Sequence, residues 1–302
     1  MRINARTVLS QSEPAQHPRI TGTLSLVPYL PCHVPLYHEW MKNPELLAAT
    51  ASEPLSLREE YEMQQSWRND PDKLTFILCW SEAPMNYNPE ALPPAGVETV
   101  SSEANDGADP VMTPALAAQL RSLGGMVGDV NLFFHAYDQE NAKSESENGS
   151  SSSSSPTNTA AYRVAEVEIM VADLAARSHG IARRALAWIM SYARTHVRAA
   201  EIDAATALSA PDAAVAPGPP EVKLFRAIVG WDNTSSARLF ETQLRFKVAK
   251  SVDVFRETHW EWEWPAKDGV EAERIVEDLE ASVSDAEWPF PGIPRYRVVA
   301  LH

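Results

Sequence analysis

The sequence predicts a mixed α/β fold for this chain of 302 residues. Short apolar runs typical of strands alternate with segments of helical periodicity. Hydrophobic residues make up 44% of the chain, which is enough for a sizeable core. Polar stretches rich in Pro and Ser lie between the expected elements and do not replace them. These three observations predict one globular unit that carries long loops.

Two strands and two helices are predicted in the N-terminal part. Leu24–Tyr29 alternates apolar and polar residues, as a half-buried strand does. Leu74–Trp80 shows no alternation, which predicts a strand that is buried on both faces. His33–Met41 has the pattern of a short amphipathic helix, and Leu57–Trp67 has helical spacing with Ser56 placed to cap it.

The rest of the chain adds strands and two further helices, without an internal repeat. Strands are predicted at Val127–Phe134, Val164–Val171, Lys223–Val229, Lys247–Val254 and His259–Trp264, and helices at Ile181–Val197 and Ser235–Leu244. In the last strand Trp260, Trp262 and Trp264 share one face, which we interpret as core packing.

The loops divide the chain into one domain and one extension. We expect a domain over residues 1–265 with inserts at about 81–125, 138–160 and 201–220, followed by an acidic, Pro-rich extension at 266–302. Short helices are expected at Pro114–Leu123 and Glu271–Ser282, and the Ser150–Ser155 tract is expected to be disordered because it buries no apolar area.

Composition and charge exclude several classes of protein. The net charge of −15 comes from the three inserts and the extension, so nothing predicts binding to nucleic acid. No apolar run is long enough to span a membrane, and the first residues lack the apolar region of a secretory signal. Cys32 and Cys79 have no metal-ligand spacing, and we expect reduced core thiols in a cytoplasmic protein without a bound metal.

The strongest chemical signal is the hexapeptide Arg177-Ser-His-Gly-Ile-Ala182, between a predicted strand and a predicted helix. A glycine at a helix N-terminus exposes backbone N–H groups and the positive end of the helix dipole, which suits a pyrophosphate. The alternative is an ordinary strand-to-helix turn. The pattern is neither a Walker A loop nor a dinucleotide-binding glycine motif.

Two motifs together resemble the GNAT superfamily of acetyltransferases. Arg177-x-x-Gly180-x-Ala182 is similar to its cofactor motif Gln/Arg-x-x-Gly-x-Gly/Ala, and the segment from Asn233 through Leu239-Phe240 to Phe246 is similar to a motif on its fourth helix. Further segments resemble the N-acetyltransferase 9-like subfamily: Tyr37–Met41, Thr50–Leu55, Met126–Phe133 and Glu166–Ala172. The resemblance implies a largely antiparallel central sheet flanked by helices.

The resemblance also implies direct acetyl transfer from acetyl-CoA to a protein amine. The acceptor would be an N-terminal α-amine, with tubulin as the substrate that the subfamily suggests, or a lysine. Cofactor-binding residues carried over from the superfamily are Met170, Val171 and Ala172 on the strand, Arg177, Ser178, His179, Gly180, Ile181 and Ala182 in the loop, and Asn233.

The general base is expected on the strand before the cofactor loop. Glu166 stands where a base glutamate lies in some superfamily members, and Glu168 is the next residue on the same face. The alternative is that both are solvated acids on a strand face. Many relatives carry a tyrosine near position 240 to protonate the leaving thiolate, but here it is Phe240, so the general acid is unassigned. We interpret His38 and Asp129 as structural.

Two other functions stay open at this point. One is acetylation of a small-molecule amine. The other is a catalytically weak fold that acts as a binding or cytoskeleton-associated module, which Phe240 keeps open. Neither cysteine has a histidine at a spacing typical of an acetyl-enzyme, so transfer is expected to be direct.

Overall fold

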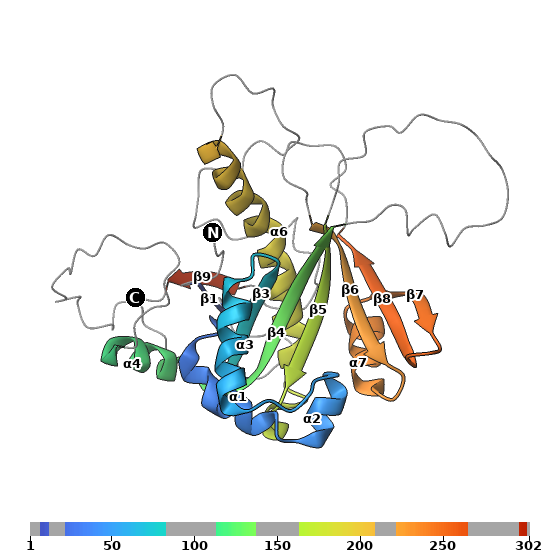
Figure 1. Ribbon diagram of the computed structural model, residues 1–302, viewed down its shortest axis with the longest axis horizontal. Coiled ribbons are helices and arrows are strands. Elements are labelled where there is room, and N and C mark those ends of the chain that lie inside the picture. Colours follow the sequence, from blue (N-terminus) through green and yellow to red (C-terminus); the bar gives the residue numbers. More distant parts are fainter. Residues whose placement is uncertain are drawn as a thin grey trace.

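The residues that the structure describes form a nine-stranded sheet with the order β7-β8-β6-β5-β4-β3-β2-β1-β9 (Figure 1). The computed structural model describes residues 7–11, 22–82, 113–136, 163–208, 222–264 and 296–300. Within these residues β5 and β6 are parallel, and all other neighbouring strands are antiparallel. The predicted fold class, a mixed α/β fold with a largely antiparallel sheet, is therefore confirmed.

The strands agree closely with the sequence pattern where that pattern was strong. Their bounds are β1 Thr7–Gln11, β2 Thr23–Pro28, β3 Lys73–Ser81, β4 Gly125–Ala136, β5 Arg163–Val171, β6 Val222–Gly230, β7 Lys247–Val252, β8 Glu257–Glu263 and β9 Tyr296–Ala300. The central strand β3 is buried from Leu74 to Cys79, as its unbroken apolar run predicts.

Helices α1 (Val34–Trp40), α2 (Pro44–Ala49) and α3 (Leu57–Asn69) cover one face of the sheet (Figure 1). A 3₁₀ turn, Pro31–His33, leads into α1. At the start of α3 the Ser56 side chain and the Glu59 side chain cap each other's backbone N–H groups, which fixes where the helix begins. Helix α2 was not predicted, because a helix of 6 residues is too short to show a helical period in the sequence.

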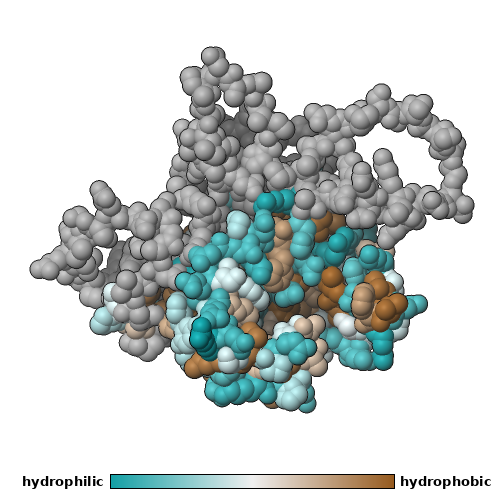
Figure 2. Space-filling view, viewed as in Figure 1, coloured by the Kyte–Doolittle hydropathy of each residue, from teal (hydrophilic) through white to brown (hydrophobic). Residues whose placement is uncertain are grey.

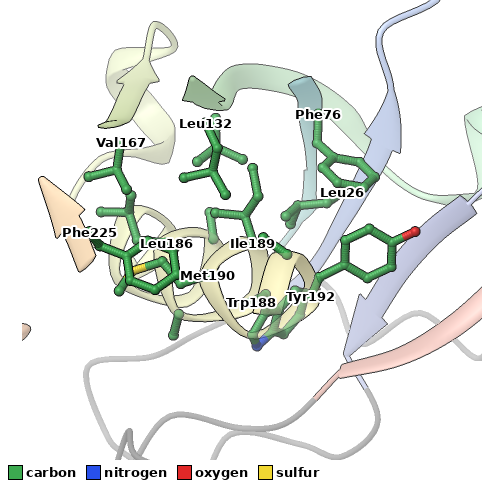
Figure 3. Packing of buried hydrophobic residues seen from close by; sticks show 14 of the residues in the cluster. Leu26, Phe76, Leu132, Val167, Leu186, Trp188, Ile189, Met190, Tyr192 and Phe225 are labelled. Carbon is green, nitrogen blue, oxygen red and sulfur yellow. The ribbon is translucent and has the colours of Figure 1, made fainter. Parts of the chain in front are cut away.

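The long helix α6 (Ile181–Leu208) lies on the opposite face, together with α7 (Thr234–Arg238) (Figure 1). Its apolar side chains pack against residues of the central strands, including Leu26, Phe76, Leu132, Val167 and Phe225 (Figure 3). From Ala185 to Ala193 every residue is buried. Within this stretch Trp188 contacts Tyr296 of β9, with ring centroids 6.0 Å apart.

The edge formed by β1 and β9 differs from the prediction. Neither strand was expected, yet they pair antiparallel from Thr7↔Ala300 to Gln11↔Tyr296 and extend the sheet. The predicted extension therefore contains a strand of the sheet. In the first insert the helix expected at Pro114–Leu123 is confirmed as α4 (Pro114–Ser122), which buries Leu116. Helix α6 continues to Leu208, within the third insert, which was predicted as a loop. The domain limits themselves remain a prediction.

Other expectations divide between described and undescribed residues. Trp260 is buried, and Trp262 and Trp264 pack against Phe225, so the tryptophan face belongs to the core. Cys79 is buried, but Cys32 is exposed in the 3₁₀ turn and is not a core thiol. The Ser150–Ser155 tract and the helix expected at Glu271–Ser282 lie outside the described residues. Figure 2 shows apolar surface over β7 and β8, where Val248 is exposed.

Candidate active site

The parallel strands β5 and β6 separate halfway along their length. They pair from Arg163↔Val222 to Glu166↔Arg226 and no further, although both strands continue (Figure 1). β5 stays paired with β4 as far as Val171↔Gly128, and β6 stays paired with β8 as far as Gly230↔Glu257, so the two halves of the sheet diverge between β5 and β6. Arg226 is held by a bond to Glu261 of β8, with Nη2 2.6 Å from Oε1. The separation leaves backbone groups of both strands facing each other without a shared ladder.

The loop that follows β5 reaches the N-terminus of α6 beside this separation. Ser178 and Gly180 both have positive φ, 69° and 70°. Glycine accepts this conformation at little cost, so Gly180 lets the chain turn sharply into the helix. The Gly180 carbonyl accepts the first helical bond, from Arg184 N at 3.1 Å. The next N–H groups of α6 therefore stand at the open end of the helix, where an anion binds well.

A buried arginine fixes this loop against the sheet. Arg184 is fully buried and donates to the His179 carbonyl (3.2 Å), the Gly22 carbonyl (3.1 Å) and Gln11 Oε1 (2.7 Å). Burial lowers the pKa of its guanidinium to about 10, so the group is still charged at neutral pH. On the other side the His179 ring lies 4.7 Å from the Trp80 ring. Sequence reasoning missed Arg184, and only its place one turn after Gly180 hinted at it.

The structure gives the predicted cofactor residues different environments. Arg177 is exposed, and its Nε donates to the Val171 carbonyl at 3.0 Å. The Ala172 N–H donates to the Val127 carbonyl at 2.9 Å, so it is occupied by β4. Asn233 caps α7 by accepting from Ser236 N at 3.1 Å. Ser178 is exposed, His179, Gly180 and Ala182 are half-buried, and the Met170 and Ile181 side chains are buried.

The two candidate bases lie on the face of β5 that is covered by α1 and α3. Glu166 lies where β5 and β6 still pair, and its Oε2 is 3.8 Å from His135 Nε2. Glu168 lies beyond the last pair and is open to solvent. Even so, desolvation by the surrounding protein, followed by the charge of Glu166, raises the pKa of Glu168 to about 7. An accessible carboxyl with many protein neighbours is typical of a concave surface.

A cluster of buried polar residues adjoins Glu168. From the sequence, Asp129 was interpreted as structural, and the other members of the cluster were not considered. Asp129 and Asn131 of β4 are 2% and 3% exposed, and Asn131 lies directly opposite Glu168. Tyr37 of α1 is buried, and its pKa is raised by burial and then by the charges of Asp129 and others, including Glu168. The sequence signal that could have indicated this cluster is the alternation of the polar residues Asp129 and Asn131 with apolar residues in one strand.

Position 240 carries no acid. Phe240 lies in a π-helical turn, Leu239–Gln243, and is 3% exposed. Its ring packs 5.2 Å from the ring of Phe246. Phe240 is thus part of the core, and the general acid stays unassigned.

A groove opens on the α1 face next to the end of β5. Its volume is about 520 Å³, and its lining is mostly apolar, with Leu36, Trp40, Asn43, Leu46, Met126, Ala172, Asp173 and Leu174 among the residues. Within the described residues no group of three or more His, Cys, Asp or Glu side chains could hold a metal ion. Every helix in the same part of the chain is too short or too polar to cross a lipid bilayer.

Comparison with known proteins identifies relatives along most of the chain. No family model matches. The chain is 31% identical to the N-acetyltransferase 9-like protein of Nematostella vectensis over 79% of its length and 81% of that protein. It is 32% identical to the alpha/beta-tubulin-N-acetyltransferase 9 of Drosophila melanogaster over 77% of its length and 79% of that protein.

Solved structures give a weaker likeness. Mycobacterium smegmatis RimJ in complex with CoA-disulfide is 13% identical in sequence, with a TM-score of 0.46. The match covers 85% of this chain and 87% of the RimJ chain. Because that score is below 0.5, the assignment rests on the sequence relatives. Their identity and coverage show that the chain belongs to the N-acetyltransferase 9-like family and is an N-acetyltransferase.

Proposed function

We propose that the protein transfers an acetyl group from acetyl-CoA to a protein amine, with an N-terminal α-amine as the preferred acceptor. The observation that carries the proposal is the separation of β5 and β6 after Glu166↔Arg226, beside the loop that opens α6. Such a gap between strand backbones suits the extended amide-bearing arm of a coenzyme, and the adjacent helix N-terminus suits its pyrophosphate.

The cofactor residues divide between two parts of the ligand. We assign the pyrophosphate to the backbone of Ser178, His179, Gly180, Ile181 and Ala182, which enters α6 through two positive-φ residues. We assign the arm and the thioester carbonyl to the backbone of Met170 and Val171. Ala172 is less suited, because its N–H donates to Val127. Arg177 ties the loop to the strand end through the Val171 carbonyl, and Asn233 acts through the cap of α7.

Glu168 is the base that the geometry favours over Glu166. It lies at the level where the strands have separated, whereas Glu166 lies within the paired part. A base works best when its pKa is near the working pH, and desolvation by the surrounding protein, followed by the charge of Glu166, raises the pKa of Glu168 to about 7. Glu168 takes a proton from the substrate ammonium, and the neutral nitrogen then attacks the thioester carbonyl. Phe240 supplies no proton to the departing thiolate.

A peptide acceptor fits the α1 face better than a small polyamine does. The groove beside Ala172 is lined mainly by apolar side chains such as Trp40, Leu46 and Leu174, with two carboxylates, Glu39 and Asp173. Apolar walls favour the side chains of a peptide, whereas a polycation needs several carboxylates. The names of relatives from Drosophila melanogaster, Mus musculus and Homo sapiens include alpha/beta-tubulin, so we propose tubulin N-termini as the first substrates to test.

The test is a comparison of three acceptors with labelled acetyl-CoA. The first is a set of peptides with the free N-termini of α- and β-tubulin. The second is the same set with blocked N-termini and one internal lysine, and the third is spermidine. Label on the free N-termini alone is the expected result. Transfer to spermidine alone would contradict a protein substrate, transfer to the blocked peptides would point to lysine, and no transfer to any acceptor would favour a binding module.

A further inference from the structure

The feature that the proposed reaction leaves unused is the buried carboxyl group of Asp129. Asn131 lies opposite Glu168 in the β4–β5 ladder, and Asp129 is two residues from Asn131. Residues two apart on a strand, and residues opposite each other across a ladder, point to the same face. Asp129, Asn131 and Glu168 therefore share the face that α1 covers. Asp129 is the diagonal neighbour of Glu168, a distance that two carboxyl side chains can bridge.

The surroundings of Asp129 do not neutralise its charge. It is 2% exposed, and Asn131 Nδ2 donates to its Oδ2 at 2.6 Å. Among the described residues no donor reaches its second oxygen, Oδ1. A buried carboxylate with one oxygen unpaired is costly, and the cost falls when the group holds a proton. Burial, and then the charge of Glu168, accordingly raise the pKa of Asp129 to about 7.

The titratable and charged groups that face this pair come from several elements. Glu166 on β5 and Lys73 on β3 act on Glu168, and Asn131 on β4 acts on Asp129. Asp129 acts in turn on Tyr37 of α1 and Tyr29 after β2, which also feel the charge of Glu60 on α3, and Glu60 faces His38. Lys73 alone among them is a permanent cation, and it acts on Glu168. The described surroundings of Asp129 itself are thus acids, an amide and phenols, and Glu168 is the charge that raises its pKa. Like-charge coupling is reciprocal, so Asp129 also opposes the ionisation of Glu168, in addition to the larger effect of Glu166.

We propose that Asp129 is a positioning residue for acetyl transfer that acts through Glu168, because its carboxyl group on the same strand face strengthens Glu168 as a base. The proposal rests on the proposed function. In the step itself the N–H bond of the substrate ammonium breaks, an O–H bond forms on Glu168, and the nitrogen keeps the electron pair. The proton then leaves from Glu168, which is open to solvent. Asp129 touches neither substrate nor cofactor.

The direction of the expected effect follows from like-charge coupling. When two neighbouring carboxyl groups compete for protons, each holds its proton to a higher pH than it would alone. A neutral residue at position 129 therefore lets Glu168 ionise at lower pH, and its carboxylate becomes a weaker base. The acidic limb of the kcat/KM profile should shift to lower pH, and the plateau rate should fall.

The experiment measures kcat/KM from pH 5.5 to 9 for the wild type, Asp129→Asn, Glu168→Gln and the double variant, with a free N-terminal peptide. We expect Asp129→Asn to move the acidic limb down by about half a pH unit or more, with unchanged acetyl-CoA affinity. In the Glu168→Gln background the same substitution should cause no further loss. If Asp129→Asn does not fold, Asp129→Leu removes the buried charge altogether and carries the same expectations.

Two results would overturn the inference, and they are distinguishable. An unmoved limb, or an equal loss in both backgrounds, would show that Asp129 only supports the fold. Full activity of Glu168→Gln, or no transfer by the wild type, would overturn the proposed base or function and the role of Asp129 with it. Glu60→Gln is the matched control, since Glu60 is an equally buried acid on the same side but on α3, and it should leave the limb unmoved.

Discussion

At the residue scale, the site depends on how two similar glutamates differ in their neighbours. Glu166 and Glu168 are two residues apart on one strand face, and the sequence could not separate them. Their difference comes from β6, which lies beside Glu166 and is no longer paired with β5 at Glu168. That divergence depends on pairing between residues about sixty positions apart, so no local pattern reports it.

Exchange of each glutamate for glutamine tests this difference. Glu168→Gln should lower the rate of transfer by about 10² to 10⁴ at neutral pH, the usual cost of losing a general base. The rate should recover in part at high pH, where more of the substrate amine is already neutral. Glu166→Gln should stay within a few-fold of the wild type. Transfer rates of both variants measured from pH 6 to 9 show which glutamate is the base. A large loss of rate in Glu166→Gln alone would assign the base to Glu166.

At the element scale, strong patterns predicted their elements well and weak ones failed. The apolar run of β3 and the capped start of α3 are local signals, and both elements are confirmed. Strands β1 and β9 have five residues each and are defined by pairing with each other, which a short segment does not encode alone. The loop before α6 was predicted as an anion-binding loop with a glycine at a helix N-terminus, whereas its anchor, Arg184, depends on contacts with β1 and Gly22 and was not predicted.

The contribution of β9 can be measured at one residue. Tyr296 is 9% exposed and packs on Trp188. Truncation of a buried aromatic side chain costs about 3 to 5 kcal/mol, so Tyr296→Ala should lower the free energy of unfolding by an amount near the low end of that range. Val298→Ala is the control in the same strand, since Val298 is 46% exposed and its truncation should cost far less. Equal values in urea unfolding would show that β9 adds little to the domain.

At the scale of the whole molecule, one sheet places three separate stretches of chain at one site. β5 and the loop at 177–180 provide the predicted cofactor side, β4 provides Asp129, and α1 and α2 border the groove. The family could be predicted from sequence, because it depends on contiguous motifs. The assignment of the loop at 177–182 to the cofactor comes from the same motifs and stays a prediction. The cluster around Glu168 could not be predicted, since its members are polar residues scattered over five elements and only the fold brings them together.

The central claim is that the protein acetylates an N-terminal amine with acetyl-CoA held at the start of α6. Its most direct test compares Gly180→Asp with Gly180→Asn. Both side chains are of similar size and tolerate the positive φ of 70° at this position, but only aspartate adds a charge where the pyrophosphate should lie. Calorimetry with acetyl-CoA and transfer to a free N-terminal peptide are measured on both. The account predicts that Gly180→Asp binds at least about tenfold more weakly than Gly180→Asn, a difference of about 1.4 kcal/mol, with a parallel loss of transfer. Equal affinity and equal transfer in the two variants would contradict it.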